Sequence, residues 1–220
     1  MRTKALLCAA ALAAGAATSM AQNVYSLNVV GYINLNLNTG LNLIANQLDA
    51  DGTTMNNFVT NVFSTNLPSG SKVYAFNATS GAYSTLTFTS GKWIGTQTAA
   101  NAALAPGQGV FVSVPSPVTL TLVGEVIQGT NKTALVQGLQ IVSSIPPISG
   151  GLQTTLGYVP TAGDKVFTYN STNQAYATHT YSSSAGTFKW IGGEPTPNVG
   201  DAFFLQAAAA TNWTQAFTVQ

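Results

Sequence analysis

The chain has 220 residues, of which 45% are hydrophobic and only 6% are charged, and its formal net charge is +1. An average globular protein carries about 25% charged residues. The near-neutral charge excludes the basic face that a nucleic-acid-binding protein needs. The high apolar content argues against intrinsic disorder. The 21 glycines and 9 prolines, with many Asn, Thr and Ser residues, are typical of strands and turns.

Residues 1–21 have the pattern of a signal peptide. Two cations precede an apolar stretch at 5–17, and Ser19 and Ala21 are the small residues that a signal peptidase requires. We expect cleavage before Gln22 and export of the protein to the cell surface, the medium or the periplasm. The apolar stretch is too short to span a membrane and no second one follows, so we expect no transmembrane segment in the mature chain.

Cys8 offers an alternative, a lipoprotein signal in which this cysteine carries the lipid. A lipidated cysteine needs a full apolar region before it, and only three residues separate Cys8 from Lys4. A cleaved signal peptide is therefore favoured. The mature chain then keeps five lysines, six carboxylates, one histidine and no cysteine. Disulfides, cysteine-based zinc sites and thiol nucleophiles are thereby excluded.

The mature chain repeats itself with an offset of 93 residues. Three pairs of words share this offset: Val30-Gly31 with Val123-Gly124, Lys72-Val73-Tyr74 with Lys165-Val166-Phe167, and 106–111 with 199–204. Two more pairs need small insertions: 40–44 with 138–142, and Trp93-Ile94-Gly95 with Trp190-Ile191-Gly192. The period is far longer than the roughly 20–50 residues of solenoid repeats. We expect an internal duplication, with unit 1 at 22–122 and unit 2 at 123–220.

Within each unit the pattern predicts β-strands. Apolar and polar residues alternate over 72–76 and 82–88 on both sides of a turn, and again over 165–169 and 175–181, as in hairpins. A short helix is predicted where apolar residues follow helical spacing after the cap residue Thr54, with a weaker echo at 152–156. The residues with that spacing are Met55, Phe58, Val59, Val62 and Phe63.

The predicted fold class is all-β and mainly antiparallel, with two similar β-sandwich or barrel-like units and one or two short helices. The predicted core consists of apolar residues from the matched words: Leu43, Ile44, Val73, Tyr74, Trp93, Phe111, Ile141, Val142, Val166, Phe167, Trp190 and Phe204.

Several words of unit 1 resemble a family of secreted bacterial β-domains. The words are GLNLIANQL (40–48), KVYAFN (72–77), GAY (81–83), KW (92–93) and PGQGVFV (106–112). Members of that family read "GWNLIS-P", "VY-YD--GGY" and "L-PG-GYWV", and the present chain has Leu41 and Leu139 where they usually have Trp. The resemblance implies a β-fold on an envelope or extracellular protein, and it implies no particular activity.

No catalytic constellation is predicted. A glycosidase needs two converging carboxylates, but Asp164 and Asp201 have no acidic counterparts in unit 1 and stand at turns. His179 is the single histidine, and the chain has no G-x-S-x-G nucleophile motif. We therefore expect a strand residue at His179, turn residues at the acids, and no enzyme.

Asp49 and Asp51 stand before Gly52, as in loops that wrap a calcium ion. The EF-hand pattern fails because no glutamate stands at its end, and an Asp-Gly turn before the helix explains the same residues. Calcium is the one cofactor for which the sequence offers a candidate site.

Trp93 and Trp190 are candidates for stacking on sugar rings. They occupy equivalent places in a repeated word, which is more typical of core anchors that recur with the fold. Exposed aromatic residues at matching sites of both units would favour a glycan binder.

Three functions follow in order of preference. The first is a non-enzymatic structural or assembly protein of the bacterial exterior, because near-zero net charge permits close packing of copies. The second is an adhesion module that binds glycans of the cell envelope or another surface. A hydrolase is third.

The N-terminal segment 24–37 is a candidate for contact between copies. Residues 26–31 resemble 119–124, the predicted last strand of unit 1, as though a preceding unit had been removed. Segment 24–37 could then pair with the C-terminal unit of a neighbouring chain by β-augmentation, giving head-to-tail oligomers. The alternative is that it completes unit 1 of its own chain.

Overall fold

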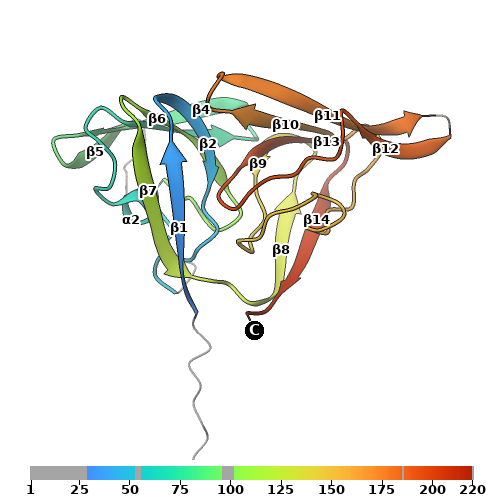
Figure 1. The fold of residues 1–220 in the computed structure, drawn as a ribbon, viewed down its shortest axis with the longest axis horizontal. Helices are drawn as coiled ribbons and strands as arrows, with labels where there is room; N and C mark the ends of the chain where they lie inside the picture. Colours follow the sequence, from blue (N-terminus) through green and yellow to red (C-terminus); the bar gives the residue numbers. More distant parts are fainter. Residues whose placement is uncertain (1–28, 53–55, 96–101, 185, 220) are drawn as a thin grey trace, which may run out of the picture.

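The computed structural model describes residues 29–52, 56–95, 102–184 and 186–219. It is mostly antiparallel β-structure, with 53% of residues in strands and 3% in a helix, which confirms the predicted fold class. The two units follow one another in the chain, and their five-stranded sheets lie together at the top of Figure 1.

Unit 1 contains β1 (Val30–Leu37), β2 (Gly40–Ala45), α2 (Val59–Phe63), β3 (Lys72–Asn77), β4 (Ala82–Thr89), β5 (Lys92–Gly95), β6 (Gly109–Val114) and β7 (Val118–Glu125). Unit 2 contains β8 (Gly129–Leu135), β9 (Gly138–Val142), β10 (Lys165–Asn170), β11 (Ala175–Ser184), β12 (Thr187–Ile191), β13 (Phe203–Ala207) and β14 (Thr211–Phe217). Because β7 continues to Glu125, the break between the units falls at 126–128.

Each unit is a sandwich of a five-stranded and a two-stranded sheet. In unit 1 the order β2-β6-β3-β4-β5 faces the ribbon β1-β7, and in unit 2 the order β9-β13-β10-β11-β12 faces the ribbon β8-β14. The two ribbons converge at the bottom of Figure 1, where β7 leads into β8. Alternating apolar residues of both sheets form a separate core in each unit.

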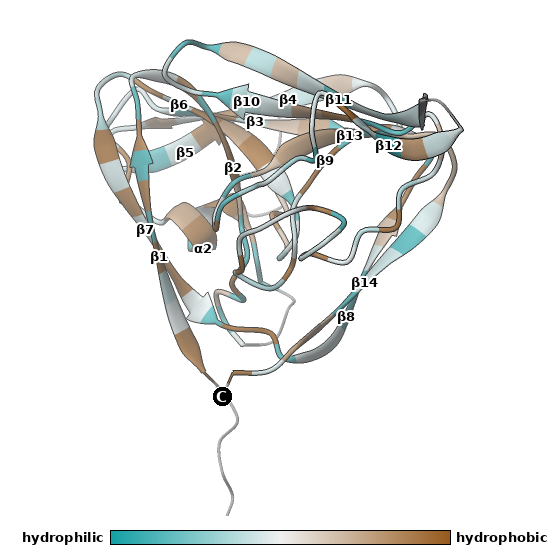
Figure 2. Cartoon of the chain, turned by 45° about the vertical axis from the view of Figure 1, so that its right-hand side comes forward, coloured by the Kyte–Doolittle hydropathy of each residue, from teal (hydrophilic) through white to brown (hydrophobic). Residues whose placement is uncertain are grey.

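The helix α2 closes the core of unit 1. Figure 2 shows it between the ribbon and the five-stranded sheet, and Val59, Val62 and Phe63 are buried there. The residue before the helix is Phe58, whose side chain makes no cap bond; the predicted cap Thr54 and the neighbouring Met55 lie outside the described residues.

Unit 2 has turns in place of this helix. The N–H groups of Thr155 and Leu156 both donate to the carbonyl oxygen of Gly151, which makes a compact turn at 152–156. Leu152 and Leu156 are buried in the core of unit 2, so the turn covers the core as the helix does in unit 1. The described part of the chain therefore has a single helix.

Four of the five repeated words occupy equivalent strands or turns. They lie in β2 and β9, β3 and β10, β5 and β12, and in the turns that lead into β6 and β13. The duplication into similar units is confirmed by these equivalent positions and by the strand order, which is the same in the two five-stranded sheets.

The match of Val30-Gly31 with Val123-Gly124 is wrong, because these words lie in the first and last strands of the same unit. Gly31 pairs with Gly124 across the ribbon β1-β7. Both positions lie where the segment 48–49 crosses the ribbon: a Cβ at Gly31 would stand 2.9 Å from Leu48, and one at Gly124 only 2.5 Å from the carbonyl oxygen of Asp49. Both words therefore contain glycine because neither position has room for a side chain.

The N-terminal segment completes unit 1 of its own chain. Val30–Leu37 pairs along its whole length with β7, just as β8 pairs with β14. The prediction that residues 24–37 pair with a neighbouring chain is therefore wrong for residues 30–37, because this strand already pairs with β7 of its own chain. Residues 24–28 lie outside the described part of the chain.

The predicted core is buried at all but three positions. Tyr74, Trp93 and Phe167 are only partly buried. Tyr74 and Phe167 lie on the faces of the five-stranded sheets that point away from the ribbons, where they pack against a third apolar cluster between the units. Alternation in β3 and β10 does not tell which face of a strand is covered by its own unit.

The two units exchange backbone hydrogen bonds in matching pairs. The N–H of Ala45 at the end of β2 donates to the carbonyl oxygen of Gly200 in unit 2, and that of Ser143 at the end of β9 donates to Gly107 in unit 1, both at 2.8 Å. Gly107 and Gly200 are equivalent residues with φ of 85° and 84°, a conformation that favours glycine. Each unit thus completes the hydrogen bonding of the other.

Gln47 adds a buried side chain to this junction. It is fully buried, its Oε1 accepts the N–H of Gly200 at 2.7 Å, and its Nε2 donates to Ser144 Oγ at 2.8 Å and to the Ser144 carbonyl oxygen at 3.1 Å. One side chain of unit 1 therefore satisfies both main-chain and side-chain groups of unit 2.

We predict that Gln47→Ala lowers the free energy of unfolding by about 3 kcal/mol, because it leaves a buried N–H and a buried carbonyl oxygen without partners. Urea unfolding followed by circular dichroism measures this loss. Gln153→Ala, which removes an exposed glutamine, is the matched control and should change stability by less than about 0.5 kcal/mol. Equal effects of the two substitutions would contradict the structural role of Gln47.

Candidate ligand-binding pockets

A cluster of aromatic rings lies where the five-stranded sheets of the two units meet. Its centre is the pair Phe111 and Phe204, which are equivalent residues with ring centroids 6.0 Å apart. Each ring also contacts a ring of the opposite β3 or β10 strand: Phe204 lies 5.7 Å from Phe76, and Phe111 lies 5.1 Å from Tyr169. The cluster thus has approximate two-fold symmetry, because Phe76 and Tyr169 are also equivalent residues.

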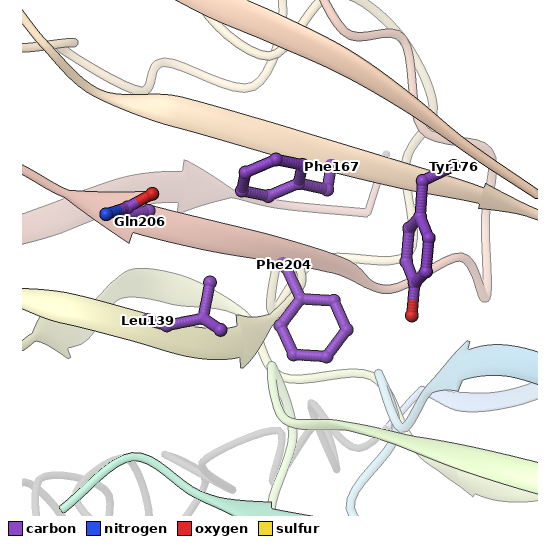
Figure 3. Close-up of a pocket in the computed structure, with 5 residues that line it drawn as sticks. All are labelled: Leu139, Phe167, Tyr176, Phe204 and Gln206. Carbon is purple, nitrogen blue, oxygen red and sulfur yellow. The ribbon is translucent and has the colours of Figure 1, made fainter. Parts of the chain in front are cut away.

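A pocket of about 380 Å³ opens beside this cluster on unit 2. Its lining is mostly apolar and consists of Leu139 from β9, Phe167 from β10, Tyr176 from β11, and Phe204 and Gln206 from β13. In Figure 3 the rings of Phe167, Phe204 and Tyr176 lie around the space, with Gln206 at its other end. The pocket is small and has one amide and one hydroxyl among apolar walls.

A second pocket of about 350 Å³ opens at the equivalent place on unit 1. It is lined by Leu41, Tyr74, Tyr83, Phe111 and Ser113, which are the counterparts of the five residues of the first pocket, and in addition by Tyr176. The duplication has therefore produced two matching pockets, and Tyr176 contributes to both.

Tyr83 and Tyr176 stand at the mouths of these pockets. They are equivalent residues, exposed to 47% and 51% respectively, and each packs on a ring behind it, Phe76 at 5.2 Å for Tyr83 and Tyr169 at 5.0 Å for Tyr176. Partial burial raises the pKa of Tyr83. Burial, with the nearby Tyr83 and Tyr169, raises the pKa of Tyr176 to about 12. The two half-exposed rings are thus close neighbours.

The two candidate tryptophans lie away from these pockets. Trp190 is buried in the core of unit 2, with 8% of its surface exposed, and offers no free ring face to a sugar. Trp93 is partly buried against Phe63 and Phe88, and its indole N–H donates to the carbonyl oxygen of Ser64 at 3.0 Å. Trp190 is thus a core residue of unit 2, whereas Trp93 packs against the outside of the core of unit 1.

The candidate calcium residues are engaged with protein groups. Asp49 is buried, exchanges backbone hydrogen bonds with Glu125, and accepts the amide of Asn57 at 2.8 Å. Asp51 accepts the amide of Asn56. Over the described residues, no three His, Cys, Asp or Glu side chains gather closely enough to hold a metal ion.

The structure brings His179 and Asp201 to one small cavity of about 240 Å³. His179 Nδ1 lies 2.8 Å from the carbonyl oxygen of Gly193, and Asp201 accepts two hydrogen bonds from Asn198. Asp164 lies elsewhere: it is buried and accepts hydrogen bonds from the hydroxyl of Tyr158 and the N–H of Ala208, each at 2.7 Å. The three groups are engaged locally and do not form a triad.

Tyr83 and Tyr176 were absent from the predicted site residues, although the sequence carried a signal for them. The words Gly81-Ala82-Tyr83 and Gln174-Ala175-Tyr176 share the 93-residue offset, with tyrosine at the same place after the turn. What the alternation does not reveal is that this face of each hairpin remains partly open.

Comparisons of the chain with protein-family models, with curated proteins and with solved structures find no match. The resemblance to secreted bacterial β-domains therefore stays a prediction. Among the residues that the structure covers, no helix combines the length and the apolar character needed to cross a bilayer.

We predict that stability falls as the pH rises from about 10 to about 12. The phenol of Tyr176 ionises near 10 in the unfolded chain but only at about 12 in the fold, so the unfolded state loses its proton first. The buried phenol of Tyr158, whose pKa burial and Asp164 also raise, acts in the same direction. Urea unfolding at a series of pH values measures the effect.

Tyr176→Phe should make the loss of stability at high pH smaller, while Tyr32→Phe, which changes an exposed tyrosine on β1, should not. A free energy of unfolding that is constant over this pH range would show that the prediction is wrong.

Proposed function

We propose that the protein is an exported, non-enzymatic binding module of the bacterial exterior, whose ligand is a glycan held at the twin aromatic pockets. The observation that supports this proposal is the pair of half-exposed tyrosines, Tyr83 and Tyr176, at matching sites of the two units. Exposed aromatic residues at equivalent sites are what distinguishes a binder from a purely structural repeat.

The chemistry of the lining suits sugar rings. A sugar presents a C–H face that packs on an aromatic ring and hydroxyl groups at its edge that need hydrogen bonds. Phe111 and Phe204 supply apolar floors, the two tyrosines supply ring faces with hydroxyl tips, and Ser113 and Gln206 supply polar groups at equivalent places. None of the lining residues is charged, which favours a neutral ligand.

The paired arrangement favours an extended glycan over a single sugar. Each pocket is at the small end of the range for ligand sites, roughly 300–1,000 Å³, so each would hold one ring-sized group. Tyr176 borders both pockets, which makes two neighbouring subsites for one chain. Two weak subsites on one rigid body raise the overall affinity by their effective concentration.

The experiment is retention of the mature protein on insoluble cellulose, chitin and peptidoglycan. We expect retention on at least one of them, a loss of about tenfold in affinity for Tyr83→Ala or Tyr176→Ala, and a larger loss for the double variant, since tenfold corresponds to about 1.4 kcal/mol. Tyr32→Ala is the matched control, because this tyrosine is 70% exposed and lies on β1 away from the pockets. Wild-type protein that passes all three matrices, or a double variant retained like the wild type, would contradict the proposal.

A further inference from the structure

β2 is an edge strand, and on its outer side a side chain makes the hydrogen bonds that a neighbouring strand would make. Gln174, in the turn between β10 and β11, accepts the N–H of Leu41 at 3.1 Å and donates to the carbonyl oxygen of the same residue at 2.9 Å. These are the two bonds that a paired strand residue would make. Asn38 adds hydrogen bonds to the same turn, to Ser171 at 3.0 Å and to Thr172 at 3.4 Å.

The closure of this edge has a conformational cost. Gln174 has a φ of 55°, in the left-handed region that side chains seldom adopt. Such a conformation persists where the surrounding contacts maintain it. The amide of Gln174 is held by its two bonds to Leu41, by the hydroxyl of Tyr169, which donates to Oε1 at 2.9 Å, and by the carbonyl oxygen of Ser171, which accepts from Nε2 at 2.6 Å.

The equivalent edge in unit 2, that of β9, has no such closure. Gly81 stands where Gln174 stands, Val136 replaces Asn38, and Leu139 replaces Leu41. A Cβ at Gly40 would lie 3.2 Å from Gln174, whereas a Cβ at Gly138 would have nothing within 4 Å. The outer edge of β2 is thus covered by Gln174, whereas the equivalent edge of β9 is uncovered.

The main-chain groups of Leu139 point to this open edge. Ser143 donates its N–H across the same edge to Gly107, and alternate residues of a strand point their N–H and C=O groups to the same side. Within the described part of the chain, no hydrogen bond reaches these groups of Leu139 from that side. Leu139 is also 37% exposed.

A cleft of about 500 Å³ adjoins the edge. Its walls include Ala78 at the β3–β4 turn, Val136, Gln140 and Thr133. The hydroxyl of Thr133 is buried and has no hydrogen-bond partner. Space, unpaired main-chain groups and an unsatisfied hydroxyl together describe a site for an extended polypeptide.

We propose that the edge of β9 receives the segment 23–28 of a second copy of this chain. The segment, Asn-Val-Tyr-Ser-Leu-Asn, precedes β1 and is uncharged. Tyr25 and Leu27 alternate with Val24, Ser26 and Asn28, so a strand would present small and polar side chains on one face, matching Thr133 and Gln140. A sugar amide does not fit as well, since its N–H and C=O point in opposite directions and cannot both reach Leu139.

Such a contact joins the N-terminal segment of one copy to unit 2 of the next copy. Because donor and acceptor surfaces differ, the contact is heterologous and can be repeated. The proposal therefore gives open head-to-tail assemblies in which β1 remains paired with β7 of its own chain.

The test is sedimentation of the mature protein over a concentration series, with Gly81→Gln as the decisive variant. Gly81 has a φ of 66° and open space around its Cβ, so a glutamine there can copy the closure by Gln174. We expect the wild type to associate, and Gly81→Gln to lose association by at least tenfold. Gly91→Gln is the matched control, because Gly91 has a φ of 74°, lies in the β4–β5 turn and is equally open.

Two further measurements identify the edge and the segment. The N–H of Leu139 should exchange slowly with solvent hydrogen in the associated protein and in Gly81→Gln, but quickly in the dilute wild type. Leu27→Pro, which removes a donor from the segment, should also abolish association. A wild type that stays monomeric at every concentration, association that survives Gly81→Gln, or association that survives Leu27→Pro would each overturn the proposal.

Discussion

The reciprocal bonding between Gly107, Gly200 and the ends of β2 and β9 holds the two sandwiches in one arrangement. Each glycine turn supplies a carbonyl oxygen to the other unit, and neither turn could carry a side chain without displacing its neighbour. The faces of the five-stranded sheets are thereby brought together around Phe111 and Phe204. The twin pockets exist because these rings fill the centre of the junction and leave its two sides uncovered.

Much of the fold could be predicted because it rests on local pattern. Alternation gave the hairpins of β3–β4 and β10–β11, and the repeated words placed equivalent strands in register. The Val-Gly match failed because steric demands at Gly31 and Gly124 produce the same word in strands that are not equivalent. A short sequence match reflects only the packing around those residues, and the same packing can occur twice within one unit as well as once in each unit.

The residues of the candidate site could not be predicted from the sequence pattern in this way. The residue type of Trp93 and Trp190 predicts sugar stacking, but Trp190 lies in the core of unit 2 and Trp93 packs against the core of unit 1. Tyr83 and Tyr176 gain significance only from packing between units, which brings residues about 93 positions apart onto one surface. Likewise, the difference between Gln174 and Gly81 has no meaning until the turn of one unit is known to lie over the strand edge of the other.

The reciprocal junction also has the symmetry of a dimer. A single unit standing alone would leave the turn at Gly107, the end of β2 and the face of Phe111 without partners. Two identical units would satisfy all of them by the same exchange, with each residue meeting its counterpart across a two-fold axis. The exchange between the two units is therefore the one that a symmetric homodimer of a single unit would make. Because the two units belong to one chain, they need not be identical, and the hairpin turn carries Gln174 on one side of the axis and Gly81 on the other.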